Sequence, residues 1–183
     1  MTTDVWSTSV DFPPDDPRNP ERVRPQALMQ GDDLRAVMGR FPTGVAVITV
    51  DLDGERVGLT LGTLVSLSID PPLAGFAIRK DAALHELLRR ASDFGVSLLA
   101  AGQEGVAQHF ARGVPPIGLW QEIGVLDEDG PPLLAGAVGW LRGKVHAEHP
   151  AGSHTFFVGE IESAEPGLSD RPLAYVRQTY RDL

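Results

Sequence analysis

Short apolar runs separated by turn-forming residues dominate the middle of this chain. The runs are rich in Val, Ile, Leu and Thr and end at turn segments such as Asp51–Gly54 and Asp70–Pro72. Runs of this kind are typical of the strands of a sheet. We predict strands over residues 44–50, 56–61, 63–69, 73–78 and 94–99.

Three segments show helical periodicity instead. The first starts with Asp32 or Asp33 as its N-cap and ends before Pro42, the second covers residues 84–91, and the third covers 103–111. In each segment the apolar residues recur at the spacing of one helix face. The predicted inward faces are Leu34, Val37, Met38 and Phe41; Leu84, Leu87, Leu88 and Ala91; and Val106, Ala107 and Phe110.

The last third contains a predicted hairpin with two long arms. One arm covers Ala137–Glu148 and the other Thr155–Ser163, with a turn around Pro150–Ser153. Strands outnumber helices, and the helices do not alternate with strands as parallel crossovers would require. The predicted fold class is therefore mainly β, a Greek-key-like antiparallel barrel with a few short helices.

The N-terminal segment has a different pattern. It carries five prolines among Asp and Arg and no apolar periodicity. We predict an extended or disordered arm over residues 1–30, or an arm that lies over a dimer partner and is anchored by Trp6 and Phe12. A single domain is predicted over residues 31–183, because a chain of 183 residues fits one hydrophobic core.

Composition removes several classes of function. The formal net charge of −9 and the pI of about 4.9 disfavour nucleic acid and anionic membranes as partners. The absence of cysteine excludes disulfides, thiolate nucleophiles and iron–sulfur clusters. No apolar stretch reaches the length of a membrane span and no signal pattern opens the chain, so a cytoplasmic location is expected.

Common catalytic motifs are missing as well. The chain has neither the GxGxxG of a dinucleotide fold, nor a complete P-loop, nor a GxSxG elbow. His146, His149 and His154 are close in sequence, but the first two are an odd number of strand positions apart. Their side chains are expected on opposite faces, so we predict no metal site.

Five blocks in order resemble the short-chain flavin reductase family, the reductase components of two-component flavin monooxygenases. They are FPTGVAVIT (41–49), VGLTLGTLVSLSIDPPL (57–73), FGVSLLAAGQEGVAQHFA (94–111), AGSHTFFVGEIESA (151–164) and PLAYVRQTY (172–180). The resemblance covers the chain from about residue 32 onward. It implies a split β-barrel of the FMN-binding type that forms a homodimer.

The same resemblance implies a set of site residues. His154 is the candidate catalytic residue on the nicotinamide side, and hydroxyls and glycines between residues 58 and 66 suit a flat ring and its phosphate. The implied cofactor-binding residues are Thr43, Gly58, Thr60, Leu61, Gly62, Thr63, Ser66, Arg79, Lys80, Arg177 and Tyr180.

Several pocket positions depart from the family pattern. Leu61–Leu64 stands where relatives usually carry Ala-Asn-Ser-Phe, so an amide is lost, while Thr63 keeps a hydroxyl. Arg79–Ala83 stands where serines and a threonine usually meet the flavin phosphate, and Ser153 replaces a common aspartate. Two cations thus replace hydroxyls at the phosphate position.

The function implied is an NAD(P)H-dependent flavin reductase. It would bind FMN or FAD, take hydride from NADH or NADPH, and supply reduced flavin to a separate flavin-dependent monooxygenase. Two alternatives remain because a fold does not fix a function. One is a split-barrel enzyme whose changed pocket catalyses another redox step or rearrangement; the other is a non-catalytic protein that binds a flavin or another flat ligand.

Overall fold

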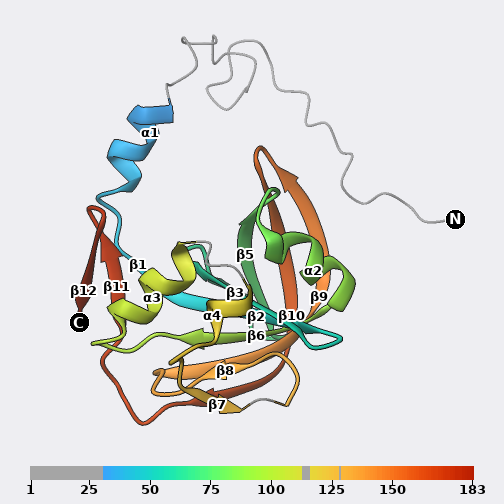
Figure 1. Ribbon diagram of the computed structural model, residues 1–183. Coiled ribbons are helices and arrows are strands. Elements are labelled where there is room, and N and C mark those ends of the chain that lie inside the picture. Colours follow the sequence, from blue (N-terminus) through green and yellow to red (C-terminus); the bar gives the residue numbers. More distant parts are fainter. Residues whose placement is uncertain (1–30, 113–115, 128) are drawn as a thin grey trace, which may run out of the picture. The chain divides into compact units, whose positions relative to one another are not determined.

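The computed structural model describes residues 31–112, 116–127 and 129–183, and the chain divides into two units between Met38 and Gly39 (Figure 1). The predicted arm over residues 1–30 lies outside the described residues. In the first unit, α1 spans Gly31–Met38. Asp32 and Asp33 lie inside its first turn, where carboxylates favour the helix dipole, so neither is the predicted N-cap. Phe41 lies beyond the end of this helix.

The second unit contains the predicted β-rich domain. Its strands are β1 (Thr43–Gly44), β2 (Ala46–Leu52), β3 (Glu55–Leu61), β4 (Val65–Ser68), β5 (Leu73–Arg79), β6 (Asp93–Leu98), β7 (Val125–Asp127), β8 (Leu133–Leu134), β9 (Gly139–Ala151), β10 (His154–Pro166), β11 (Leu173–Val176) and β12 (Thr179–Asp182). Its helices are α2 (Ala83–Ala91), α3 (Glu104–Ala111) and α4 (Pro116–Leu119). The mainly β fold class is confirmed.

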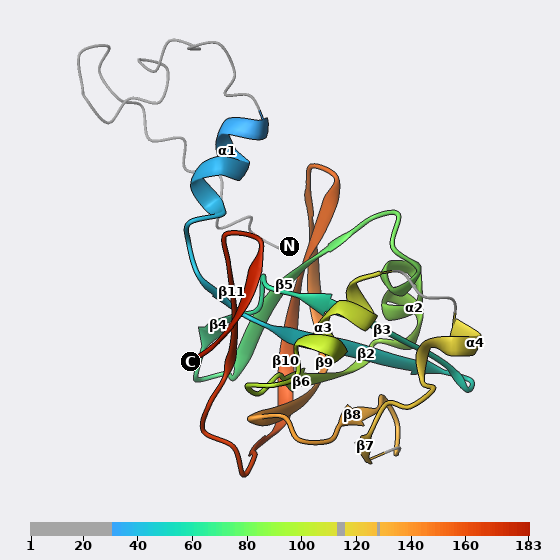
Figure 2. The ribbon, with the colours of Figure 1, turned by 60° about the vertical axis from the view of Figure 1, so that its left-hand side comes forward.

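The largest sheet has the strand order β3-β2-β6-β9-β10-β5-β4, with every pair antiparallel. Its two edge strands, β3 and β4, are consecutive in the chain and are joined by residues 62–64 alone. The sheet must therefore curl until its edges lie near each other, which makes a barrel that is split at this connection (Figure 2). A smaller sheet, β1-β11-β12, and the pair β7-β8 complete the unit.

Two turns show how local sequence sets the strands. Asp53 and Gly54 have φ values of 55° and 86°, and the Gly54 N–H donates to Asp51 Oδ1 at 2.9 Å, so the predicted turn 51–54 is confirmed. The long hairpin turns more tightly than predicted, because Pro150 and Ala151 pair within β9. Only residues 152 and 153 form its turn, where Gly152 has a φ of 60°.

One predicted strand divides in two. Residues 44–50 were expected to form a single strand, but Val45 separates β1 from β2. The Val45 N–H donates to Leu173 O at 3.1 Å, and its carbonyl accepts from the Leu99 N–H at 2.9 Å. This residue therefore carries the chain from the small sheet to the large one, a change of sheet that periodicity does not reveal.

Aromatic side chains fill the barrel. Phe76 lies between Phe94 and Phe157, with ring centroids 5.2 and 5.9 Å away, and all three rings are buried. Helix α2 packs on β2, and α3 packs on β3 through Phe110. None of the helices among the described residues combines the length and the apolarity that a bilayer crossing requires.

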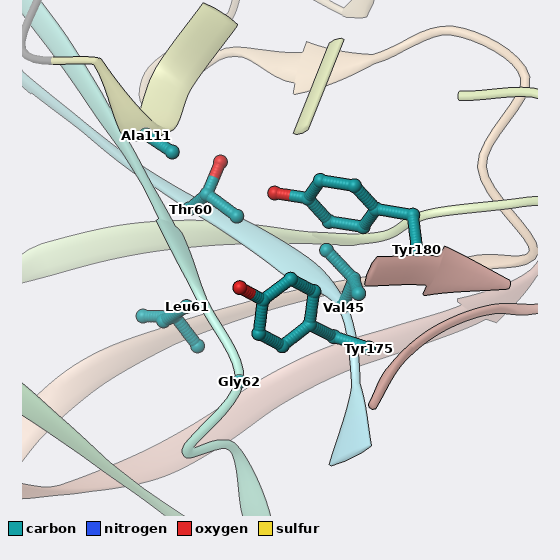
Figure 3. Close-up of a pocket in the computed structure, with 7 residues that line it drawn as sticks. All are labelled: Val45, Thr60, Leu61, Gly62, Ala111, Tyr175 and Tyr180. Carbon is teal, nitrogen blue, oxygen red and sulfur yellow. The ribbon is translucent and has the colours of Figure 1, made fainter. Parts of the chain in front are cut away.

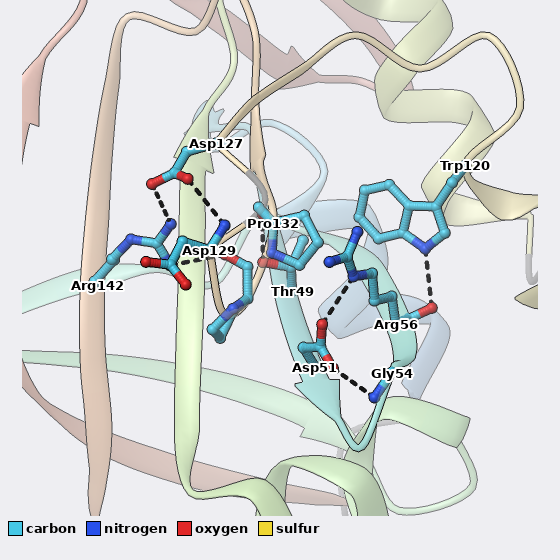
Figure 4. A network of polar contacts seen from close by, with 10 residues as sticks. Thr49, Asp51, Gly54, Arg56, Trp120, Asp127, Asp129, Pro132 and Arg142 are labelled. Carbon is cyan, nitrogen blue, oxygen red and sulfur yellow. Dashed lines mark hydrogen bonds and ion pairs between the residues drawn. The ribbon is translucent and has the colours of Figure 1, made fainter.

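A polar network fixes the segment around β7 and β8 to the barrel (Figure 4). The buried Thr49 hydroxyl donates to Pro132 O at 2.8 Å, and Arg142 donates to Asp127 Oδ2 at 2.9 Å. The Trp120 indole N–H donates to Arg56 O at 2.9 Å. These side-chain hydrogen bonds give partners to polar groups that strand pairing does not engage.

Candidate functional site

The candidate site lies at the connection between the two edge strands of the large sheet. Residues Gly62–Leu64 link β3 to β4 there, and the small sheet brings its hairpin β11–β12 to the same place. Two distinct groups of residues adjoin this connection, and Thr63 joins them.

The first group, which we call the tyrosine pocket, is a cavity of about 230 Å³. Figure 3 shows its two tyrosine rings opposite β3, with their hydroxyls directed toward Thr60 and Leu61. The lining is largely apolar, which suits a flat heteroaromatic ring. The lining residues are Val45, Thr60, Leu61, Gly62, Ala111, Tyr175 and Tyr180.

The β11–β12 hairpin positions the two tyrosines. Tyr175 and Tyr180 are direct cross-strand partners, and their ring centroids are 5.0 Å apart. The two-residue turn between the strands places Arg177 and Gln178 at φ values of 50° and 59°, a region that favours glycine. The Arg177 N–H donates to Gly39 O at 2.6 Å, which ties the turn to the start of this unit. Partial burial raises the pKa of Tyr180.

The hydroxyls of two threonines beside the pocket make different contacts. Thr60 Oγ1 donates to Ala107 O on α3 at 2.7 Å, so this hydroxyl helps to hold the helix on β3. Thr43 lies on β1, opposite Tyr175 in register. A Cβ placed on Gly62 would lie 2.8 Å from Thr43 Oγ1, so the two residues are in close contact.

Thr63 connects the tyrosine pocket to β5. The Ala77 N–H donates to Thr63 Oγ1 at 3.0 Å, and Thr63 Oγ1 donates to Ala77 O at 3.3 Å. The side chain thus contacts the β5 backbone two residues before β4 begins at Val65. It sets the distance between Gly62 and Arg79, which lies two residues after Ala77.

The second group, which we call the charged edge, consists of Arg79, Lys80, Asp81 and His154. His154 is the cross-strand partner of Arg79. Lys80 holds the hairpin turn twice, through its N–H to Ser153 O at 3.1 Å and its Nζ to Gly152 O at 2.8 Å. Ser153 Oγ lies 3.0 Å from His154 Nδ1. The hydroxyl at position 153 therefore contacts the histidine ring directly.

An ion pair constrains the charged edge. The Arg79 guanidinium donates twice to the Asp81 carboxylate, at 2.9 and 2.5 Å. This pairing lowers the pKa of Asp81. Both side chains are about two-thirds exposed, so solvent screens the pair and weakens it.

Three predicted site residues lie apart from these groups. Gly58 is buried in β3, and a Cβ there would lie 2.6 Å from the Phe110 ring, so core packing explains this glycine without a cofactor. Ser66 is exposed on β4 and borders a different, apolar cavity. The Arg177 side chain is exposed at the hairpin turn.

Sequence reasoning missed Val45, Ala111 and Tyr175 as pocket residues. For Tyr175 a signal was present, because two tyrosines that flank a four-residue segment become partners if that segment folds as a tight hairpin. Val45 and Ala111 carry no such signal, since they are small apolar residues in a sequence that has many.

The residues present fit a flavin. Gly62 has no side chain to block the pocket beside Tyr175 and Tyr180, whose rings are tilted by 58° to each other, and two cations lie at the charged edge for a phosphate. Within the described ranges, no three His, Asp or Glu side chains are grouped as metal ligands.

Comparison with known proteins gives a consistent result. Residues 38–183 match the model of the flavin reductase like domain. The chain is 41% identical over 148 residues to an NADH-dependent FAD reductase of Streptomyces globisporus, which covers 79% of each chain. It is 38% identical to the reductase component of 4-hydroxyphenylacetate 3-monooxygenase of Thermus thermophilus, over 82% of this chain and 95% of that one.

Solved structures agree with these relatives. The flavin reductase component BorF of a bacterial two-component tryptophan halogenase superposes with a TM-score of 0.78 at 34% identity, covering 84% of this chain and 98% of that chain. The Streptomyces globisporus NADH:FAD oxidoreductase SgcE6, in complex with NAD and FAD fragments, gives a TM-score of 0.78 at 35% identity, covering 85% and 96%. The predicted split-barrel fold is confirmed.

Proposed function

Because this chain belongs to the flavin reductase-like family, we propose that it is an NAD(P)H-dependent flavin reductase that holds FMN or FAD between the tyrosine pocket and the charged edge. The observation that carries the assignment to this place is Thr63. Its two bonds to Ala77 join an apolar slot for a ring to a pair of cations for a phosphate.

Each group of residues has a separate task in this proposal. The tyrosine pocket excludes water from one part of the ring, because its walls are aromatic and aliphatic. Arg79 and Lys80 neutralise the phosphate, Arg79 by leaving Asp81 and Lys80 from its place at the hairpin turn. His154, held by Ser153, lies beside Arg79 and lines the nicotinamide side.

A flavin bound here supplies the redox chemistry, since it accepts a hydride from a reduced nicotinamide. The protein then needs no nucleophile or acid–base pair of its own. Its contribution is to orient two flat rings and keep water away from them. This division agrees with a site made of hydroxyls, aromatic rings and cations.

The names of two relatives support a separate partner enzyme. Two of them are named as the reductase component of a monooxygenase and of a tryptophan halogenase. We therefore place this chain with a separate flavin-dependent oxygenase that receives the reduced flavin, in the cytoplasm, where nicotinamide cofactors are available.

A homodimer is part of the proposal. Edge strand β4 and the residue after it expose Val65, Leu67 and Ile69, with exposed fractions of 44, 46 and 85%. An open edge strand with apolar side chains favours pairing with a second copy. Light scattering on the purified chain tests this, and a monomer at micromolar concentration would contradict it.

The experiment on function follows NADH and NADPH absorbance with purified protein and increasing free FMN or FAD. Oxidation that saturates with added flavin is expected. A tightly bound yellow chromophore without turnover would instead favour an enzyme with a changed pocket. Neither binding nor turnover with either flavin would overturn the proposal.

A further inference from the structure

The Thr43 hydroxyl differs from the neighbouring threonine hydroxyls in its hydrogen bonding. Its side chain is half-buried, and Thr43 Oγ1 has no hydrogen-bond partner among the described residues. The neighbouring hydroxyls of Thr60 and Thr63 are both engaged by backbone carbonyls, as described above. Among the described residues no side-chain N or O atom is both buried and unpartnered, so Thr43 Oγ1 is open to water or to a ligand.

Gly62 leaves room for this hydroxyl. A Cβ on Gly62 would meet Thr43 Oγ1 at 2.8 Å, whereas the next nearest atoms, Thr43 Cβ and Gly44 O, would lie at 3.6 and 3.7 Å. The φ of Gly62 is not positive, so the backbone itself does not require glycine here. The single close neighbour of a larger residue would be the Thr43 hydroxyl.

From this geometry we infer that the Thr43 hydroxyl binds the polar edge of the flavin ring, and that Gly62 keeps that hydroxyl accessible. The inference rests on the proposed function. The polar edge of a flavin ring alternates N–H donors with carbonyl acceptors. A hydroxyl suits either partner, because it donates one hydrogen bond and accepts others.

The pair also explains how the chain tolerates the lost amide at position 62. With glycine there, no side chain of that residue reaches the ring. Thr43 approaches the same point from β1, opposite Tyr175, and so supplies a polar group to the rim of the tyrosine pocket.

The first test removes the hydroxyl. Thr43→Ala is expected to weaken lumiflavin and FMN binding by the same factor, roughly fivefold, in fluorescence titrations. Lumiflavin lacks the phosphate tail, so an equal effect places the contact on the ring. Thr43→Ser keeps the hydroxyl and should bind as the wild type does. Ser163→Ala, an exposed hydroxyl deletion on β10, is the matched control.

The second test is a double-mutant cycle with Gly62→Ala. Alone, this substitution should also weaken flavin binding roughly fivefold, because the new methyl group displaces the Thr43 hydroxyl. In the Thr43→Ala background, Gly62→Ala should not weaken flavin binding further, since the remaining neighbours lie at ordinary contact distances. Gly105→Ala, where a Cβ meets nothing within 4 Å, controls for glycine replacement.

The outcomes separate this inference from the proposed function. If the wild type binds no flavin, the proposed function fails. If the wild type binds flavin but Thr43→Ala binds equally well, or if the two losses simply add, the role of Thr43 is refuted while the function stands. A loss for FMN without one for lumiflavin would also refute it, because the contact would then be with the phosphate.

Discussion

The tyrosine pocket and the charged edge adjoin the same short connection, Gly62–Leu64, yet they differ in polarity and charge. The pocket has apolar walls, and the Thr60 hydroxyl on its lining is already bonded to the protein. The charged edge is exposed, and its strongest contact is the ion pair of Arg79 with Asp81. Affinity from the pocket should resist salt, whereas affinity from the edge should fall as ionic strength rises.

This difference teaches how one site can hold a ring firmly and a phosphate loosely. Burial of a ring depends on shape and is set when the chain folds. Exposed cations act through a field that solvent and salt weaken. A reductase that releases its flavin to another enzyme needs both kinds of contact, and the two can be changed separately.

The largest expected effect comes from removing both cations of the edge. The double substitution Arg79→Ala with Lys80→Ala should weaken FMN binding roughly 100-fold at low salt, because each charge-assisted contact is worth about tenfold. Lumiflavin binding should be unchanged. The control, Arg90→Ala with Lys144→Ala, removes the same charge elsewhere; an equal loss there would show a general field effect instead.

The aromatic wall is expected to give the next largest effect. Tyr175→Ala should weaken FMN and lumiflavin alike by roughly tenfold, because both lose stacking and apolar contact. Tyr175→Phe keeps the ring and should bind nearly as the wild type does. Fluorescence titration measures both, and an unchanged affinity in the alanine variant would remove this wall from the site.

Alkaline pH should act on the pocket through Tyr180. Partial burial raises its pKa above the ordinary 10.0, so the unfolded chain loses this proton at lower pH than the folded chain does. The corresponding stability is present below pH 10 and is lost as the pH rises through the folded pKa. The Tyr175→Phe variant isolates the signal, because the chain has two tyrosines. In an alkaline pH titration, the midpoint of phenolate absorbance should be higher for the folded protein than for the denatured protein. Coincident midpoints would contradict the burial of Tyr180.

A smaller effect, an increase in FMN affinity, is expected from removing the ion pair between Arg79 and Asp81. Asp81→Asn removes the competing carboxylate and should tighten FMN binding roughly threefold, with no change for lumiflavin. Asp93→Asn is the control for lost negative charge. If the two variants behave alike, Asp81 acts through net charge and not as the partner of Arg79.

The smallest expected effect concerns the turn that carries the tyrosines. Gln178→Gly should stabilise the fold by about 1 kcal/mol, because glycine adopts the positive φ without a Cβ penalty. Gln178→Ala retains the Cβ and should gain nothing. Thermal unfolding compares them, and flavin affinity should stay constant in both; equal melting temperatures would show that the turn is not strained.

Much of the fold was predictable from local patterns. The turn at Asp51–Gly54, helix α2 and the core positions of α3 follow from turn chemistry and apolar spacing, which act over a few residues. The errors arise where pairing with distant residues overrides the local pattern. Val45 breaks a continuous apolar run because it changes sheets. Pro150 can pair in β9 because β6 pairs only with residues 139–144, so β9 is an edge strand at Pro150.

The sequence by itself determined the kinds of residues at the site: the hydroxyls after Gly58, the two cations after Ile78, and His154 in its block. The tertiary structure alone decided how they combine. It placed Gly58 under Phe110, attached Thr63 to Ala77, and brought Tyr175 and Thr43 to Gly62. The physical reason is that these contacts join residues at least 14 positions apart in the chain, and their meeting depends on how separate elements pack, which apolar spacing within one element does not encode.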